Sequence, residues 1–247
     1  MHFATSFLCL ILTISTGRLR DNRDLELFGV LLNVGSSGSN PNGRGRIFED
    51  FNFEYLPIPE TEETIEKVPI YRELGFLDVK FPDLPVHFDP EFEAFSYGHV
   101  KRGFGDIECL LKLKRNDMLF FYATLQKGEK WYPYVIGYFM SLEVHDCRKL
   151  AREQILSFKS KGFANNAHLK RIDTHVDFLI KGGEGSKLLK KAFPLSENDN
   201  PLKLRKHLGN IILTATGKMI ESGKPWFRWT LWCEKSNELV ELVNSVL

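Results

Sequence analysis

The chain has 247 residues, 43% of them hydrophobic and 13% aromatic, which is ample for a packed core and excludes a largely disordered protein. Its 33 Lys and Arg residues nearly cancel its 32 Asp and Glu residues, so any contact with nucleic acid must rest on a local basic patch and not on net charge. The four cysteines are widely scattered without a CxxC pair, a pattern that argues against a zinc ribbon or redox motif and suits a reducing cytoplasm.

Residues 1–27 differ from the rest of the chain. Residues 3–15 are apolar like the core of a signal peptide, but no Lys or Arg precedes them and no A-x-A cleavage site follows. This run is also too short to span a bilayer. We expect residues 1–27 to be an over-extended start or a poorly ordered leader. One domain would follow over residues 28–247, in the cytoplasm and without a membrane partner.

The first strand is predicted over residues 28–34, a short apolar run. A polar loop rich in Gly, Ser and Asn follows and delivers Arg44, Gly45 and Arg46. Loops of this kind can present successive backbone N–H groups to an anion. No helix signal and no GxxxxGK[ST] motif follows, so the loop is not a P-loop.

Aromatic residues dominate the next part of the chain. Phe51, Phe53 and Tyr55 alternate with polar residues, which predicts a strand with one aromatic face. A short helix is expected at residues 70–76. Residues 81–105 form an aromatic-rich loop, whose rings either surround a ligand or plug one end of a barrel.

Two apolar strands are predicted at residues 118–122 and 134–144, after a turn at Asn116 and with a polar hairpin between them. Gly137 inside the second strand indicates a bulge or the close approach of another backbone. A small twisted barrel needs such features to bend its sheet. The charge pattern of residues 146–157 then predicts an amphipathic helix.

The last third of the chain is predicted to alternate strands with two helices. The first helix would begin at Ser186, which follows a glycine-rich loop and can cap it. The other expected elements are a polar turn at 165–169, strands at 174–180, 211–216 and 226–233, and a closing helix at 236–247.

Signals for metal binding or nucleophilic catalysis are weak. His87 and Asp89 stand two residues apart, and His168 and His175 could add ligands, but solvated or structural histidines fit this pattern better. Neither GxSxG nor SxxK is present. We therefore assign no metal ligands, and the cofactor is unknown.

Paired carboxylates are a further candidate. In a regular strand Asp50 and Glu54 would share one face, where they could act as acid, base or Mg²⁺ ligands. Asp89 and Glu91 form a second pair. The alternative is a solvated strand face.

Basic residues lie close to aromatic residues in several segments, a combination that suits phosphates and unstacked bases. Lys101 and Arg102 follow Tyr97, and Lys170 and Arg171 follow His168. Solvated surface charges would give the same pattern.

Six segments resemble the third type of nucleotide-modification-associated domain. They are GRGRIFEDFNFEYLPIPE (43–60), HFDPEFEAFSYG (87–98), NDMLFFYATL (116–125), YVIGYF (134–139), NNAHLKR (165–171) and GSKLLKKAFPLS (185–196). The third and fourth also resemble the strand pair of PUA-like barrels, a group that includes readers of modified bases. The resemblance implies a role linked to modified nucleotides in DNA, and no established reaction.

The same resemblance implies a set of site residues. They are Arg44, Asp50, Glu54, His87, Asp89, Tyr97, Asn166 and His168. Arg44, with Gly45 and Arg46, would hold a phosphate, and Tyr97 or Phe48 would stack on a base. Asp50, His87 or Asp89 would bind the base edge or transfer a proton. Sequences of this type often carry proline at position 46 and glycine at position 51, where this chain has Arg46 and Phe51.

The sequence thus predicts an α+β domain on a mixed, barrel-like sheet of PUA type with flanking helices. It would bind a nucleotide or a modified base in nucleic acid, with DNA as the expected partner. One alternative is an enzyme of nucleotide modification that uses Asp50, Glu54, His87 and Asp89, with or without a divalent metal. The other is a scaffold whose aromatic loops bind a protein.

Overall fold

The structure is a computed structural model. It describes residues 29–33, 45–100, 110–197, 200–205, 208, 211–214, 231–233 and 235–245. The predicted leader, the loop that carries Arg44, and most of the strand expected at 226–233 lie outside these residues. Within them, no helix is long and apolar enough to cross a membrane.

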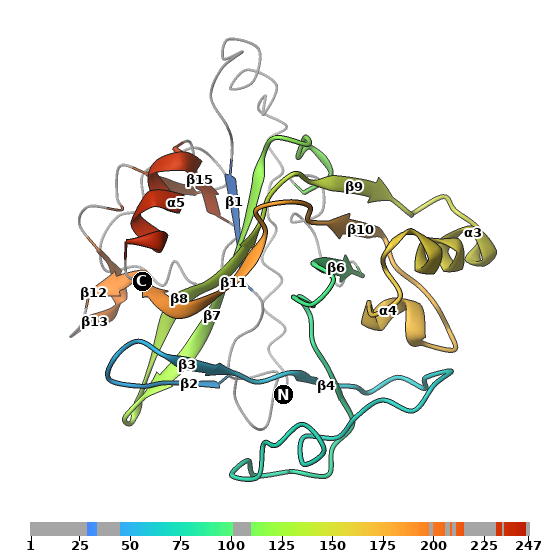
Figure 1. Ribbon diagram of the computed structural model, residues 1–247, viewed down its shortest axis with the longest axis horizontal. Coiled ribbons are helices and arrows are strands. Elements are labelled where there is room, and N and C mark those ends of the chain that lie inside the picture. Colours follow the sequence, from blue (N-terminus) through green and yellow to red (C-terminus); the bar gives the residue numbers. More distant parts are fainter. Residues whose placement is uncertain are drawn as a thin grey trace, which may run out of the picture.

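A curled, eight-stranded half-barrel sheet forms the centre of the fold (Figure 1). Its strands are β1 (Gly29–Asn33), β2 (Gly45–Ile47), β3 (Phe53–Tyr55), β7 (Met118–Lys127), β8 (Lys130–Phe139), β11 (Lys187–Pro194), β14 (Ile212–Thr214) and β15 (Leu231–Cys233). The main path runs β11-β8-β7-β1-β15-β14, with β2 between β7 and β3. β1 and β2 lie parallel to β7, whereas the other neighbours are antiparallel. The sheet is therefore mixed and curled, as predicted.

Smaller elements complete the described part of the chain, which is mostly β with few helices. A three-stranded sheet of order β6-β10-β9 contains β6 (Ser96–His99), β9 (Glu143–Asp146) and β10 (Phe178–Lys181). Two strand pairs join β4 (Ile58–Pro59) to β5 (Val86–His87) and β12 (Ser196–Glu197) to β13 (Asn200–Leu204). The helices with described bounds are α3 (Arg152–Leu156), the 3₁₀ helix η1 (Ser157–Lys161), α4 (Ala167–Lys170) and α5 (Ser236–Asn244).

The central strand β7 is buried on both faces. Leu119 and Phe121 point to one core, which the β6-β10-β9 sheet covers, and Phe120 and Tyr122 point to a second core. Helix α5 closes the second core with Leu239 and Val243. This two-sided burial explains why β7 is an almost continuous apolar run in the sequence.

Gly137 has both of the roles that the sequence predicts. Phe121 pairs with Gly137 but Tyr122 pairs with Val135, so the register shifts by one residue at this point. A Cβ atom on Gly137 would also overlap the Phe92 ring and lie 2.7 Å from the Lys187 carbonyl oxygen. The missing side chain lets β11 and an aromatic ring of the β5–β6 connection approach the strand closely.

Three helix predictions need correction. Residues 71–75 form successive turns, and the helix expected from residue 146 begins only at Arg152, because residue 146 ends β9 and residues 147–151 form a turn and irregular backbone. The helix expected after Ser186 is the strand β11. Ser186 Oγ accepts a hydrogen bond from the Met140 backbone N–H (2.9 Å) and caps no helix. Pairing with β8 buries Leu189 and Phe193, and this tertiary packing overrides the local helix signal.

The strand predicted through residues 51–55 is also shorter than expected. Residues 49–51 form a turn, with Phe51 at a φ of 65°, and β3 begins only at Phe53. Asp50 and Glu54 therefore do not belong to one regular strand, and the expectation that they share a strand face is wrong.

Residues 60–85 leave the sheets as a long excursion between β4 and β5 (Figure 1). A small apolar cluster of Leu56, Tyr71 and Val86 holds its base, and the Tyr71 hydroxyl donates to the Pro57 carbonyl (2.8 Å). At the same base, the Glu60 N–H donates to the Pro85 carbonyl (2.8 Å). The excursion thus positions Glu60 beside the residues of β5.

Candidate functional site

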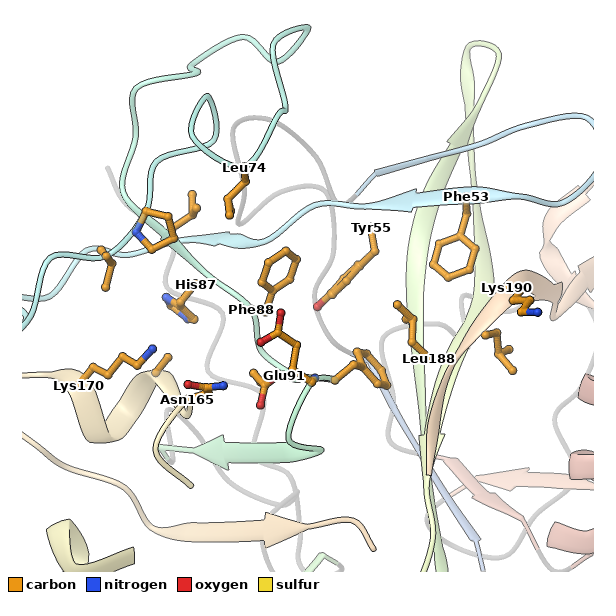
Figure 2. A pocket seen from close by; sticks show the side chains of 17 residues that line it. Phe53, Tyr55, Leu74, His87, Phe88, Glu91, Asn165, Lys170, Leu188 and Lys190 are labelled. Atoms are coloured by element: carbon orange, nitrogen blue, oxygen red, sulfur yellow. Dashed lines mark hydrogen bonds between the residues drawn. The ribbon is translucent and has the colours of Figure 1, made fainter. Parts of the chain in front are cut away.

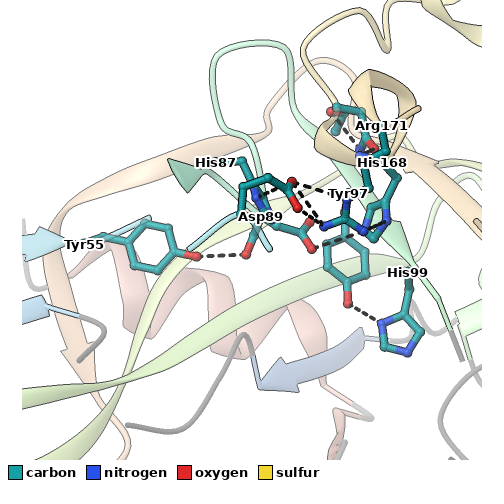
Figure 3. A network of polar contacts seen from close by, with 10 residues as sticks. Tyr55, His87, Asp89, Tyr97, His99, His168 and Arg171 are labelled. Atoms are coloured by element: carbon teal, nitrogen blue, oxygen red, sulfur yellow. Dashed lines mark hydrogen bonds and ion pairs between the residues drawn. The ribbon is translucent and has the colours of Figure 1, made fainter. Parts of the chain in front are cut away.

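A buried ionic cluster lies where the excursion, β5 and α4 meet (Figure 3). Glu60 is at its centre, with a side chain that is only 2% exposed. The Arg171 guanidinium, just after α4, contacts both carboxylate oxygens: Nη2 lies 3.1 Å from Oε1, and Nε and Nη2 each lie 3.3 Å from Oε2. His87 Nδ1 lies 2.9 Å from Oε2, within ion-pair distance but not aligned for a hydrogen bond.

The surroundings of Glu60 keep its carboxylate ionised. Burial opposes ionisation, but the nearby His87, the Glu62 N–H and Arg171 outweigh burial and lower the pKa of Glu60 to about 2. His87 Nδ1 faces this carboxylate at a distance of 2.9 Å. The other ring nitrogen, Nε2, is then the atom of His87 that remains for another partner.

Arg171 also connects the cluster to His168 and Asp89. Its Nη1 lies 3.1 Å from His168 Nδ1, and because a guanidinium can only donate, His168 Nδ1 accepts. His168 Nε2 then carries the proton and lies 3.7 Å from Asp89 Oδ2. The Tyr55 hydroxyl donates to the Asp89 carbonyl oxygen (2.9 Å). One chain of contacts thus runs from Glu60 to β3.

Local structure fixes the position of His168. Asn166 caps α4 because its Oδ1 accepts a hydrogen bond from the His168 N–H (3.2 Å). Gly98 in β6 leaves room for the imidazole, since a Cβ atom there would lie 2.6 Å from His168 Cδ2. His168 is therefore held from both sides.

An aromatic pocket of about 590 Å³ adjoins the cluster at His87 (Figure 2). This volume falls within the usual range for small-molecule sites. The rings in its wall are Phe53, Tyr55, Phe88 and Phe92, and its polar lining residues are His87, Glu91, Glu93, Asn165, Lys170 and Lys190. The walls come from β3, the excursion over residues 60–85, β5 and the β5–β6 connection, the segment of α4, and β11, which lie far apart in the sequence.

Cationic side chains mark the two ends of the aromatic pocket. Figure 2 shows Lys170 with His87 and Asn165 at one end and Lys190 at the other. Lys170 is half-buried and Lys190 exposed, and neither ammonium has an ion-pair partner in the part of the chain that the structure describes. Both are available to an anionic group of a ligand.

The residues predicted around the polar loop lie outside this pocket lining. Gly45 is buried in β2 at a φ of 125°. Arg46 is exposed, with Nε 2.9 Å from Glu54 Oε2 and its guanidinium over the Phe48 ring. Asp50 accepts from the Asn52 N–H (3.1 Å) within its own turn. Binding or catalytic roles for these residues stay predictions, and Arg44 lies outside the described residues.

The other predicted residues come together. His87, Asp89, Asn166, His168 and Tyr97 gather around the ionic cluster (Figure 3). The Tyr97 ring is 6% exposed and already packs against the core, while its hydroxyl lies 3.2 Å from His99 Nδ1. The stacking role predicted for it is untested.

Sequence reasoning did not single out Glu60, Phe88 or Lys190. Glu60 closes the first family-like segment directly after two alternating prolines, and no local signal indicated its burial. Phe88 and Lys190 line the same pocket only because of the tertiary fold. The described residues contain no group of three or more His, Cys, Asp or Glu side chains arranged to hold a metal ion.

Comparison with protein families matches residues 29–239 to the family described as nucleotide modification associated domain 3. This stretch covers more than half of the chain and confirms the resemblance found in the sequence. Comparisons with curated proteins and with solved structures find no match. The PUA-like part of the resemblance stays a prediction.

Proposed function

Because the chain belongs to the nucleotide modification associated domain 3 family, we propose that it binds a nucleotide or a modified base within nucleic acid. The base occupies the aromatic pocket, and DNA is the proposed polymer. The observation that carries this proposal is a ligand-sized aromatic pocket with an unpaired lysine at either end, among the described residues.

Phe88 is the ring best placed to stack on a base. It is half-buried and lines the pocket, and its aromatic contact is a tilted one with Tyr55 at 6.2 Å between centroids. Both Phe88 and Phe92 pack against the same core, but only the Phe92 ring lies edge-on against both Phe121 and Phe139. A base on Phe88 would lie between the lysine ends, where phosphates on either side could reach an ammonium group.

Replacing Phe88 by alanine should weaken binding of short single-stranded DNA about tenfold or more, because base–aromatic stacking is lost. Fluorescence polarisation with labelled oligonucleotides at two salt concentrations measures this. Phe81→Ala is the matched control, since Phe81 is 41% exposed and outside the pocket lining. Phe48→Ala tests the segment after β2 that the sequence favoured. If Phe48→Ala weakens DNA binding and Phe88→Ala does not, the binding site lies near β2 and the proposed role of the pocket is wrong.

An enzyme of nucleotide modification is the second candidate, favoured by the geometry of His87. Its Nδ1 faces an ionised carboxylate while the ring lines the pocket, an arrangement that orients an imidazole for proton transfer to a bound ligand. Mass spectrometry of oligonucleotides after incubation with the protein distinguishes the two functions. A change in the oligonucleotide mass that the wild type causes, and that His87→Gln abolishes while binding persists, would establish an enzyme. If the oligonucleotide masses do not change, the function remains that of a binding protein.

A further inference from the structure

Glu91 is a buried carboxylate in the wall of the aromatic pocket. Its residue is only 7% exposed, and two backbone hydrogen bonds with Ser96, both 2.9 Å, close the turn that it begins. The side chain folds back over this turn. Oε1 accepts from the backbone N–H groups of Glu93 and Ala94, and Oε2 accepts from Ala94 (3.0 Å).

These contacts leave Oε2 of Glu91 able to accept one more hydrogen bond. A carboxylate offers about four acceptor positions, and the turn fills two on Oε1 and one on Oε2. In the described part of the chain, no Lys, Arg or His forms an ion pair with Glu91. Oε2 thus keeps a position that no donor among the described residues fills, and a ligand N–H placed there would form a charge-assisted hydrogen bond.

The position of this carboxylate relates it to the proposed stacking ring. Figure 2 shows the Glu91 carboxylate beside Phe88, inside the pocket and between the Lys170 and Lys190 ends. A base that stacks on Phe88 would lie beside the Glu91 carboxylate, within the same pocket (Figure 2). The pocket therefore combines a platform for the ring with an acceptor for its edge.

We infer that Glu91 makes the pocket selective for bases that carry a ring N–H on their Watson–Crick edge. These are guanine, thymine, uracil and derivatives that keep this proton. Adenine and cytosine carry a ring-nitrogen lone pair at this position, which repels the carboxylate oxygen, so their amino groups would donate only beside an opposing lone pair. The inference rests on the proposed function, because it names which bases the pocket accepts.

N3-methylation of thymine tests the inference on the unmodified protein. Labelled oligothymidine should bind about tenfold or more tightly than the same oligonucleotide with N3-methylthymine, and oligoadenine should also bind weakly. Fluorescence polarisation measures all three affinities. Equal binding of the methylated and unmethylated forms, or a preference for adenine, would overturn the inference while leaving nucleic-acid binding intact. No binding of any oligonucleotide or nucleoside monophosphate would instead refute the proposed function.

Glu91→Gln assigns the selectivity to this side chain. An amide oxygen at the Oε1 position can still accept from Glu93 and Ala94, while an NH₂ group at the Oε2 position replaces an acceptor with a donor and gives up the second contact with Ala94. The preference for thymine over N3-methylthymine should fall to within about twofold, with the melting temperature little changed. Glu129→Gln, at the exposed tip of the β7–β8 hairpin, removes the same charge and should keep the preference. A Glu91→Gln protein that stays folded and keeps the full preference would contradict the assignment.

Discussion

Replacing Arg171 by alanine should lower the free energy of unfolding by about 3–5 kcal/mol, because it leaves a buried carboxylate without its cation. The Glu60 side chain is 2% exposed and that of Arg171 11%, so water cannot take over the lost contacts. The change also removes the donor to His168 Nδ1. Urea denaturation of wild type and variant measures the difference.

An exposed ion pair provides the matched control for Arg171. Arg72 Nη2 lies 3.0 Å from Asp83 Oδ2, but the side chains are 57% and 67% exposed, so Arg72→Ala should cost less than about 1 kcal/mol. Adding Glu60→Gln to Arg171→Ala should restore part of the stability, since it removes the stranded charge. If Arg171→Ala costs no more than Arg72→Ala, the ionic cluster does not support the fold as described.

The pH dependence of stability gives an independent view of the same cluster. The pKa of Glu60 is lowered in the folded protein from 4.5 to about 2, so its stabilisation is complete above pH 4.5. As the pH falls from 4.5 through about 2, the folded state must take up a proton that the unfolded state has already bound, and this contribution disappears. Without Arg171, the loss of stability over this acid range should be smaller.

Gly45→Ala should reduce the free energy of unfolding by more than about 3 kcal/mol through steric overlap and backbone strain together. Gly45 has a φ of 125°, and a Cβ atom there would overlap the Glu54 carbonyl oxygen across the β2–β3 pair. Since the obstructing atom belongs to the backbone, no rotamer change can relieve the overlap. Thermal and urea denaturation measure the loss.

Gly75→Ala measures the cost of backbone strain without steric overlap, and so serves as the control for Gly45→Ala. Gly75 also has a positive φ, 85°, but nothing lies within 4 Å of its Cβ position, so alanine there should cost about 1 kcal/mol. The sequence predicted Gly45 as a phosphate contact. A stable Gly45→Ala protein that only binds nucleic acid less tightly would favour that role over the structural one.

Local patterns predicted the central elements well, because each carries its own signal. The apolar runs of β1, β7 and β8, the bulge at Gly137 and the amphipathic α5 can all be read from neighbouring residues. The single strand expected over residues 134–144 is wrong in its second half, because β8 ends at Phe139 and residues 143–146 form β9 in the three-stranded sheet. The strand β11 could not be predicted from neighbouring residues, because this segment becomes a strand only by pairing with β8, more than 40 residues earlier. The turn at Phe51 was also missed, because the alternation of aromatic and polar residues predicts a strand there. The glycine that similar sequences often carry at this position agrees with the positive φ of Phe51.

The candidate site was predictable in part for the same reason. His87, Asp89, Asn166 and His168 stand in short, chemically distinctive segments, and the structure brings them together. The pocket itself is made of ordinary phenylalanines and lysines from four distant segments, so only the fold gives them a common function. The burial of Glu60 likewise depends on the excursion folding back onto β5.

Photo-crosslinking with 5-iododeoxyuridine, placed at one position of a short single-stranded DNA, tests most directly that a base enters the aromatic pocket. Irradiation attaches the base to an aromatic side chain that it contacts, and mass spectrometry of the digested protein identifies the peptide. We predict an adduct on the peptide that contains Phe88 or on the one that contains Tyr55, with loss of the Phe88 adduct in Phe88→Ala. Adducts confined to Phe48 or to surfaces away from the pocket would contradict the proposed site.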